Sequence, residues 1–568
     1  MTRGSGLRAA ALLCLMLFLV LPIGAGLWET ARAAFGILPA VGGDQWTLDP
    51  WYRLFDLPGI GTSIRLTLFT GFASTLIALV LAAGFAAAVH GRPGHTLAAR
   101  LLAPLLAAPH AALAIGLAFL LAPSGWIVRL ISPWATGWTR PPDLALVNDE
   151  WGMALIIGLL VKEVPFLLLM IFSALAQLPV GRHIATGRML GYGRGMIWLK
   201  VILPQVYPLI RLPVFVVLAF SLSVVDMAII LGPSNPPVLA VAITRWFNAP
   251  DTTLILSAAA AACLQTALIG IAIAVWYGAE RAVMRLVRWW LYRGGRGGAA
   301  SPGLWAATSG VVALMTLGAL AGLALVQWSL AWRWRFPDPV PASWSLAGWL
   351  DPSSGWGDVF MTTLVLGAAT TALSLCLAIA WLEADDRPPG LRRAFATLLI
   401  YLPLMVPQIG FLYGLNVIFL RLGMSGGWAG VLWAHTLFVF PYVIIALADP
   451  WRALDPRLVQ SAASLGAGRW RRLWSVKLAT LLRPILIAAA IGFAVSVSLY
   501  LPTLFMGAGR IATLTTEAVT LASGSDRRIA GLYGVLQAAL PFIAYAAAIA
   551  IPAMLYRHRR GMTGGAAR

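Results

Sequence analysis

Residues 67–79 read TLFTGFASTLIAL, and residues 363–375 read TLVLGAATTALSL. Each segment lies in an uncharged apolar stretch long enough for a helix to cross a hydrocarbon core of about 30 Å, which takes about 20 residues. Because two similar segments lie in different halves of the chain, we interpret the chain as two copies of one helical unit. The pair therefore predicts a duplicated membrane protein.

The composition of the 568-residue chain agrees with this interpretation. Hydrophobic residues make up 60% of it, charged residues only 11%, and the mean hydropathy is +0.83. A soluble protein would expose much of this apolar sequence to water, so secreted toxins and cytosolic enzymes are excluded. Cys14, Cys263 and Cys376 all lie in apolar stretches, which leaves no disulfide framework and no paired-cysteine metal site.

Long apolar stretches recur along the whole chain, and we predict an all-α polytopic membrane protein with about 12 transmembrane helices. The first stretch is similar to a signal peptide, but residues 22–28 lack a convincing cleavage site, so we expect it to remain as a helix. The predicted spans lie near residues 9–28, 66–89, 101–122, 151–177, 206–230, 253–277, 303–330, 359–382, 395–420, 427–448, 484–507 and 530–556.

Charged residues are distributed unevenly between the two faces that these spans define. Of the 41 Lys and Arg residues, 28 lie in the termini and alternate loops of one face, whereas 13 of the 21 Asp and Glu residues lie on the other. The positive-inside rule makes the basic face cytoplasmic. We expect a multi-pass protein of the cell inner (plasma) membrane with both termini in the cytoplasm. The excess charge orients the chain and attracts membrane lipid, and no nucleic-acid partner is expected.

A second match between the halves is clearer than the first. Residues 185–193, ATGRMLGYG, correspond to residues 460–468, QSAASLGAG, and the same spacing relates Ser223 to Ser498. Because each half has six predicted spans, the two repeats share one orientation in the membrane. The predicted divisions are a first repeat at 1–280 with its matched loop at 178–205, a basic cytoplasmic linker at 281–302, and a second repeat at 303–568 with its loop at 451–483.

Both matched loops contain small residues followed by Leu-Gly. This pattern suits a short helix that ends in a tight turn, because glycine tolerates the left-handed conformation that a helix end often needs. In the first copy a proline follows the glycine by thirteen residues. The motif residues are Ala185, Thr186, Gly187, Leu190, Gly191 and Pro204 in the first loop, and Gln460, Ser461, Ala462, Leu465 and Gly466 in the second.

These segments resemble the EAA loop of permease subunits of binding-protein-dependent ABC importers, and the duplicated six-span chain resembles their fused permeases for ferric iron and thiamine. The resemblance implies the type I ABC importer permease fold, with two parallel six-helix repeats around a translocation path. In that family the EAA loop forms a coupling helix that docks on a separate ATP-binding subunit. The implied partners are two copies of that subunit, which bind the ATP, and a periplasmic solute-binding protein; no cofactor is expected on this chain.

The two loops depart from the family pattern at three positions. Ala185 and Gln460 stand where the family usually has an acidic residue, and Ala479 stands where the second copy would have a proline. A salt bridge through the acidic residue cannot form, so we expect shape and flanking basic residues to contact the ATP-binding subunit. These basic residues are Arg188, Arg194, Arg469, Arg471 and Arg472.

The chain carries no ATP-binding loop of its own. A P-loop needs a lysine followed by Ser or Thr, and none of the three lysines, Lys162, Lys200 and Lys477, has that neighbour. We also find no residues with credible catalytic spacing and no cluster of metal ligands. We therefore predict a transport subunit and not an enzyme.

Polar residues inside the predicted spans are candidates for function, because a charge at the bilayer centre is costly. Asp226 with Ser223, and Ser498 in the second half, are candidates for lining the translocation path; for Asp226, structural hydrogen bonding is the alternative. The adjoining charges at 162–163 and the lone His435 are interpreted as buried structural residues.

Two alternatives stand beside this interpretation. Twelve spans in two parallel repeats also describe an autonomous secondary transporter coupled to an ion gradient, although such proteins usually carry more ionisable residues in their spans. The matched loops would also suit interfacial helices that only complete the fold. The outer loop at 123–150 has no long equivalent in the second half, so we expect an asymmetric surface toward the binding protein.

Overall fold

The computed structural model describes residues 16–92, 107–292, 301–384, 399–400, 402–404, 406–524 and 526–557. Several predicted features lie partly or wholly outside this range. They are the beginnings of the spans near 9–28, 101–122 and 395–420, the second part of the linker, Cys14 and most of the charged residues of the two termini.

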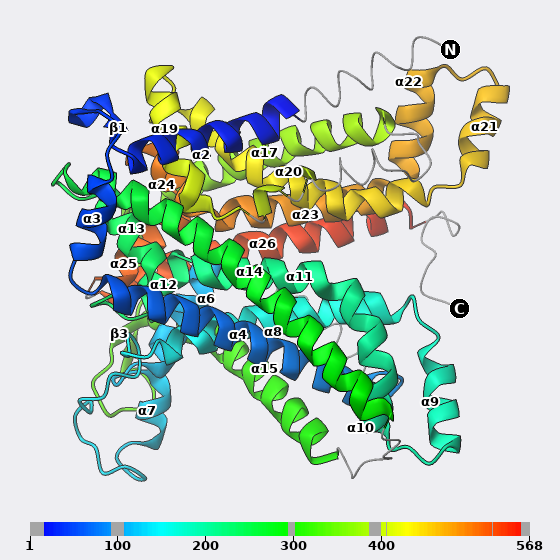
Figure 1. The fold of residues 1–568 in the computed structure, drawn as a ribbon, viewed down its shortest axis with the longest axis horizontal. Helices are drawn as coiled ribbons and strands as arrows, with labels where there is room; N and C mark the ends of the chain where they lie inside the picture. The colour runs from blue at the N-terminus through cyan, green and yellow to red at the C-terminus, as the bar shows by residue number, and fades with distance from the viewer. Residues whose placement is uncertain are drawn as a thin grey trace.

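The first half of the described chain is a series of helices interrupted by one short hairpin (Figure 1). Its elements are η1 (Met16–Val20), α2 (Leu21–Ala34), β1 (Ile37–Leu38), η2 (Pro39–Val41), β2 (Gly43–Asp44), α3 (Asp49–Asp56), α4 (Ile60–Val89), α6 (His110–Leu121), α7 (Trp126–Ile131), α8 (Met153–Leu175), α9 (Val180–Met189), α10 (Arg194–Ile197), η3 (Trp198–Ile202), α11 (Leu203–Ser223), α12 (Asp226–Leu231), α13 (Leu239–Phe247) and α14 (Leu254–Tyr292).

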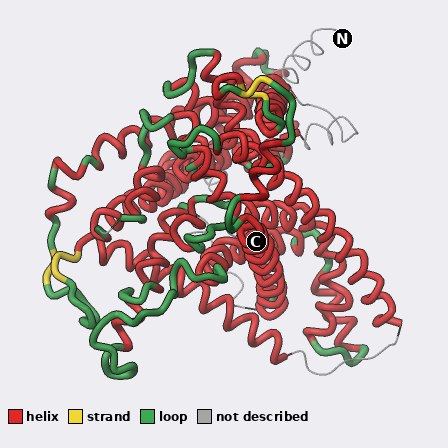
Figure 2. The backbone as a smooth tube through the Cα atoms, turned by 60° about the vertical axis from the view of Figure 1, so that its left-hand side comes forward, coloured by secondary structure: helices red, strands yellow, loops and turns green. Residues whose placement is uncertain are grey.

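The second half follows the same order. Its elements are α15 (Ser301–Leu330), β3 (Ala331–Arg333), β4 (Ser343–Trp344), α16 (Ala347–Leu350), η4 (Pro352–Ser354), α17 (Trp356–Ala384), α19 (Gln408–Arg421), α20 (Trp428–Arg452), α21 (Pro456–Ser464), α22 (Arg469–Arg472), η5 (Leu473–Leu478), α23 (Leu482–Ser498), α24 (Leu501–Gly507), α25 (Leu514–Ala522) and α26 (Arg527–Leu555). The strands of the described residues form two small antiparallel hairpins, β1 with β2 and β3 with β4 (Figure 2).

The helices confirm the all-α polytopic fold predicted from the sequence. Among the described residues, nine are long and apolar enough to cross a membrane, and the bent pair Arg469–Leu478 and Leu482–Ser498 supplies a tenth if it is one span. About 12 spans were expected. The two further predicted spans, near 9–28 and 395–420, begin in residues that the structure does not describe.

Helix α14 extends further than the sequence suggested. It continues to Tyr292 and so includes the first part of the stretch predicted to be a linker, residues 281–302. The reason is local, because residues 281–292 contain neither glycine nor proline and hold several good helix formers. Helix α15 begins at Ser301, just before the predicted end of that linker.

The two halves are joined by close backbone contacts at two helix crossings, α2 with α19 and α6 with α15. At the first crossing, a Cβ on Gly414 would strike the carbonyl oxygen of Gly26 and the amide of Thr30; Gly414 instead donates its N–H to Thr30 Oγ1 at 3.1 Å. At the second, a Cβ on Gly116 would strike the carbonyl group of Ala321. Small residues matter here because helices in lipid associate through close packing more than through hydrophobic burial.

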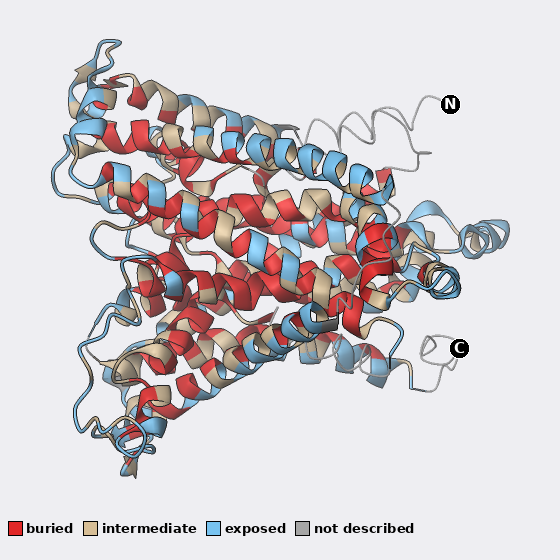
Figure 3. Ribbon diagram, turned by 60° about the horizontal axis from the view of Figure 1, so that its bottom comes forward, coloured by how far each residue is buried: buried red, intermediate tan, exposed pale blue. Residues whose placement is uncertain are grey.

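Each half also contains the same hydrogen bond between a corresponding pair of helices. In the first half, Thr67 Oγ1 of α4 accepts a hydrogen bond from the amide of Leu239, at the start of α13, at 2.8 Å. In the second half, Thr363 Oγ1 of α17 accepts one from the amide of Leu514, at the start of α25, also at 2.8 Å. Both threonines are buried, and buried residues gather in the middle of the bundle while exposed residues dominate its two ends (Figure 3).

Replacing Gly414 by leucine should weaken the contact between the halves. The side chain has no room against the backbone of α2, so overpacking should cost at least about 2 kcal/mol and lower the temperature of thermal unfolding in detergent. Gly322→Leu is the matched control, because Gly322 lies in a helix with nothing within 4 Å of an added Cβ. Equal thermal stability of the two variants would contradict the proposed packing.

Candidate functional site: two matched loops

The two loops singled out by sequence lie at the same end of the bundle (Figure 1). Helix α9 packs against α10 and η3, and helix α21 packs against α22 and η5. The hairpins β1–β2 and β3–β4 lie at the opposite end. We call these the α9/α21 end and the hairpin end.

Both short helices end in the tight turn that the glycines predicted. Gly191 and Gly466 have φ angles of +82° and +81°, the left-handed conformation. In the first loop the amide of Tyr192 donates to the carbonyl oxygen of Gly187 at 3.0 Å, and that of Gly191 donates to Arg188 at 2.9 Å. This pair of bonds is the Schellman motif, which satisfies carbonyl groups left over at a helix end.

The second loop repeats this motif residue by residue. The amide of Ala467 donates to the carbonyl oxygen of Ala462 at 2.9 Å, and that of Gly466 donates to Ala463 at 3.0 Å. Helix α21 also has a defined start, because the Asp455 side chain accepts a hydrogen bond from the amide of Arg457. The two loops therefore share one backbone geometry although their side chains differ.

Each turn presents a large apolar side chain to the outside. Leu465 is 88% exposed and Leu190 is 58% exposed, and both immediately precede the left-handed glycine. Ala185, Thr186, Gln460 and Ser461 are exposed on the same helices, whereas Gly187 and Ala462 are half-buried. The motif residues of α9 and α21 thus form two exposed projections, which we call knobs. One side of each knob packs on the rest of the protein.

The segments that follow the two turns have similar backbone conformations, but different contacts hold them to the rest of the protein. A short helix in each, α10 or α22, leads into a π-helix, η3 or η5. Pro204 lies in the first turn of α11, where its missing N–H needs no partner. In the second half Ala479 follows η5 and α23 starts later, at Leu482.

Arg194 corrects one expectation about these loops. It was expected to contact a partner, but it is half-buried and its guanidinium donates to the carbonyl oxygens of Ala87, at 2.6 Å, and of His90. It thereby ties the first loop to α4. Its counterpart Arg469 is exposed. Only tertiary contacts distinguish the two arginines, since both stand three residues after the turn glycine.

The second loop is held by an ion pair of another kind. Lys477 Nζ lies 2.6 Å from Glu383 Oε2, at the end of α17, and 5.7 Å from the ring centroid of Trp451. Lys200 lies in the corresponding part of the first loop, over the rings of Trp290 and Tyr192. Arg194, Lys200 and Lys477 therefore make contacts within the protein, whereas Arg188, Arg469 and Arg471 are exposed.

The candidate path residues lie where two helices break. Helix α11 ends at Ser223 and α12 begins at Asp226; in the second half α23 ends at Ser498 and α24 begins at Leu501. Both serine hydroxyls donate to carbonyl oxygens one turn back in their own helices. Asp226 is buried and interacts electrostatically with Lys162 and Tyr500.

Buried polar contacts between helices were not predicted in detail. Glu163 of α8 accepts a hydrogen bond from Ser221 of α11, and Lys162 Nζ donates to the carbonyl oxygen of Ala108 at 2.6 Å. In the second half the ring of His435 on α20 lies 2.9 Å from Ser496 Oγ of α23, and its other nitrogen lies 2.8 Å from Thr503 Oγ1. His435 is thus the satisfied buried histidine that the sequence suggested. Neither set of contacts has a signal in the sequence beyond the matched positions of Ser221 and Ser496.

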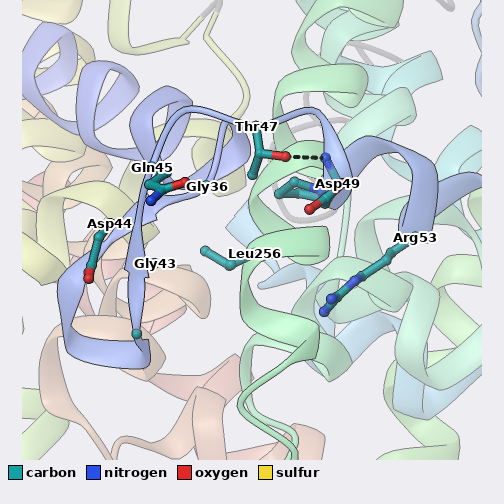
Figure 4. A pocket seen from close by; sticks show the side chains of 10 residues that line it. Gly36, Gly43, Asp44, Gln45, Thr47, Asp49, Arg53 and Leu256 are labelled. Carbon is teal, nitrogen blue, oxygen red and sulfur yellow. Dashed lines mark hydrogen bonds between the residues drawn. The ribbon is translucent and has the colours of Figure 1, made fainter.

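A pocket of about 300 Å³ lies at the hairpin end, and sequence reasoning did not single it out (Figure 4). Its walls come from the β1–β2 hairpin, the start of α3 and one residue of α14. Thr47 Oγ1 accepts a hydrogen bond from the amide of Asp49 at 3.1 Å and so shapes one wall. The lining residues are Gly36, Gly42, Gly43, Asp44, Gln45, Thr47, Asp49, Pro50, Arg53 and Leu256. Among the described residues, no group of His, Cys, Asp and Glu is arranged to hold a metal ion.

Comparison with known proteins assigns the chain to a family. It is 31% identical over 504 residues to the inner membrane ABC transporter permease protein YnjC of Escherichia coli (strain K12), and the match covers 88% of this chain and 90% of that protein. The chain belongs to the ABC transporter permeases. The permease is also 28% identical over 153 residues to the molybdenum transport system permease protein ModB of the same organism, which is 24% of this chain and 66% of ModB.

A third relative, matched over a shorter stretch of the chain, is also a permease. The permease is 27% identical over 78 residues to the spermidine/putrescine transport system permease protein PotC of Escherichia coli (strain K12), which is 14% of this chain and 30% of PotC. No family model matches the chain.

These relatives confirm the predicted function: the chain is a permease subunit of an ABC importer, a multi-pass inner-membrane protein and not an enzyme. They give no support to the alternative of an autonomous secondary transporter.

The Arg194→Ala substitution should make the first loop more mobile while the transmembrane helices stay packed. Two carbonyl groups of α4 lose a charged donor, a hydrogen bond of the kind worth about 1.5 to 3 kcal/mol. We expect amide hydrogen exchange in residues 180–197 to become at least about tenfold faster. Arg188→Ala is the control, because Arg188 is exposed. Equal exchange rates in the two variants would show that Arg194 does not anchor the loop.

Proposed function

We propose that α9 and α21 are the two docking elements through which ATP-binding subunits drive this permease. The supporting observation is the shared backbone geometry of the two turns, with Gly191 and Gly466 at nearly the same φ and the same two hydrogen bonds closing each helix. A dimer of identical ATP-binding subunits offers two similar sockets, and two similar knobs at one end of the bundle suit it.

The contact relies on shape and apolar surface more than on ion pairs. Ala185 and Gln460 replace the acidic residue that the family usually has, and Arg194 is used within the protein. Leu190 and Leu465 are exposed next to the turns, and an exposed large apolar side chain on a rigid turn suits an apolar socket. Arg188 and Arg471 are exposed and supply positive charge beside it.

We further propose that the α9/α21 end faces the cytoplasm, with both termini on that side. The charge distribution supports this, since 28 of the 41 Lys and Arg residues fall in the loops and termini assigned to that face. The hairpin end would then face the periplasm and receive a solute-binding protein. The pocket beside β1–β2 and the long loop at 123–150 lie on that surface.

The two halves are proposed to be repeats, at 1–280 and 303–568, that move against each other around a central path. Matched features support this division: the Thr67 and Thr363 hydrogen bonds, the crossings at Gly116 and Gly414, and the helix breaks before Asp226 and Leu501. Helices broken in the middle of the membrane often line transport paths, because their ends leave backbone groups available to a solute.

Within the family, we place the chain beside the fused permeases for ferric iron and thiamine, because one chain carries both halves. The named relatives are transport permeases for chemically different cargoes, molybdenum for ModB and spermidine or putrescine for PotC. The solute is then selected by the binding protein that delivers it, and the permease supplies the path and the coupling.

The coupling role predicts a specific defect. Aspartate at both Gly191 and Gly466 adds a charged side chain where the backbone has a positive φ, so it should distort both turns while the spans stay intact. We expect the Gly191→Asp/Gly466→Asp variant to insert normally, to lose co-purification with the ATP-binding subunit at least about tenfold, and to lose uptake.

The control places the same substitution at positive-φ glycines of the hairpin end. Gly137 and Gly423 have φ angles of +71° and +69° and open space around them. The Gly137→Asp/Gly423→Asp variant should co-purify with the ATP-binding subunit as the wild type does. Uptake at the wild-type rate by the Gly191→Asp/Gly466→Asp variant would defeat the assignment of the docking elements.

A further inference from the structure

Helix α14 is much longer than a bilayer requires. Its 39 residues extend over about 58 Å at 1.5 Å per residue, whereas the hydrocarbon core is about 30 Å thick. The last three turns, residues 281–292, lie at the α9/α21 end (Figure 1), where Trp290 lies against Lys200 of η3. In the proposed topology this end is also where the basic residues gather.

The last turns of α14 carry a basic stripe. Arg281, Arg285 and Arg288 are spaced by four and three residues, so they share one face of the helix, and all three are exposed. Residues 281–292 contain no acidic residue, and the carboxylate that precedes them, Glu280, is paired with Arg211. This stripe therefore presents three positive charges together.

An apolar stripe runs beside the basic one. Leu286 is 64% exposed and Trp289 is 55% exposed. Going back along the helix, the same face continues through Val275, 56% exposed, and Ile271, 58% exposed, which belong to the part of α14 that is apolar enough to cross the membrane. The exposed apolar surface of the extension is thus continuous with the lipid-facing surface of the span.

The remaining face of α14 is fixed to α11 and to the first loop. Glu280 accepts hydrogen bonds from Arg211 Nε at 2.9 and 3.0 Å. Further along, the Lys200 ammonium lies 4.5 Å from the ring centroid of Trp290 and 5.3 Å from that of Tyr192, whose amide closes the turn at the end of α9. The extension is therefore held in one orientation, with its basic and apolar stripes facing outward.

We propose that Arg281, Arg285 and Arg288, together with Leu286 and Trp289, form a binding surface for anionic phospholipid at the headgroup layer. The arginines pair with lipid phosphates, and the apolar stripe lies against the acyl chains. Each basic residue near an anionic membrane surface contributes about 1 kcal/mol, so three together select anionic over zwitterionic lipid. An acidic protein surface would explain the charges and not the apolar stripe that continues from the membrane.

This site connects lipid to the first loop. A lipid bound along α14 restrains the extension against η3, and Lys200 lies between Trp290 and the residue that closes α9. The second half has no matching feature among the described residues, because α26 ends at Leu555 and Tyr556 then donates to the carbonyl oxygen of Ala479 at 2.7 Å. Lipid binding itself does not depend on the docking role of α9, so the two proposals fail separately.

The test uses the purified full chain in detergent with phosphatidylglycerol or phosphatidylcholine added, and native mass spectrometry to count retained lipid. The wild type should retain phosphatidylglycerol in preference to phosphatidylcholine. In Arg281→Gln/Arg285→Gln/Arg288→Gln that preference should fall by about 30-fold to 160-fold, the range for loss of about 1 kcal/mol per charge over two or three sites. Arg281→Lys/Arg285→Lys/Arg288→Lys keeps the charges and should keep most of the preference.

The control removes three exposed arginines from the hairpin end, in Arg53→Gln/Arg140→Gln/Arg333→Gln. It should bind phosphatidylglycerol as the wild type does. The proposal is overturned if the α14 variant keeps the wild-type preference, or if the control loses as much. It is also overturned if the α14 variant keeps its lipid but no longer co-purifies with the ATP-binding subunit, which would identify a protein partner for the arginines.

Discussion

Close backbone packing between the halves is the constraint on which the rest of this structure depends. Lipid chains are as apolar as leucine side chains, so helices gain little by hiding apolar surface from lipid and must instead fit together closely. Gly414 against α2, and Gly116 against α15, allow the first helix of one half to lie on the third helix of the other. This exchange of helices holds the two matched halves together.

An arrangement of this kind suits a transporter that is driven by a separate subunit. Two turns with the same hydrogen bonds lie at one end, and matched helix breaks follow the spans that end at Ser223 and Ser498. In the first half η3 continues directly into α11, whereas in the second half a bend of 78° separates η5 from α23, so a displacement at α9 or α21 reaches the next span through differently shaped segments. The anchors differ, Arg194 on α4 in one half and Lys477 on Glu383 in the other, so the two loops share a backbone geometry but are held by different contacts.

Much of this could be predicted from sequence, because spans and turns leave local signals. Charge-free apolar stretches predicted helices close to those observed, and the Leu-Gly pairs predicted the left-handed turns at Gly191 and Gly466. What could not be predicted depends on contacts between distant segments. Arg194 and Arg469 hold equivalent places in sequence, yet only Arg194 meets carbonyl groups of α4. The exchange of helices between halves and the direction of the α14 extension likewise have no local signal.

The most direct test of the account asks what the two turns touch in the membrane. A photoactivatable residue placed at Leu190 or Leu465, both exposed at the α9/α21 end, should form adducts with the ATP-binding subunit of the assembled transporter. The same probe at Leu422, which is 64% exposed at the other end of the spans, should not. Adducts with that subunit from Leu422, or none from either turn, would contradict the account.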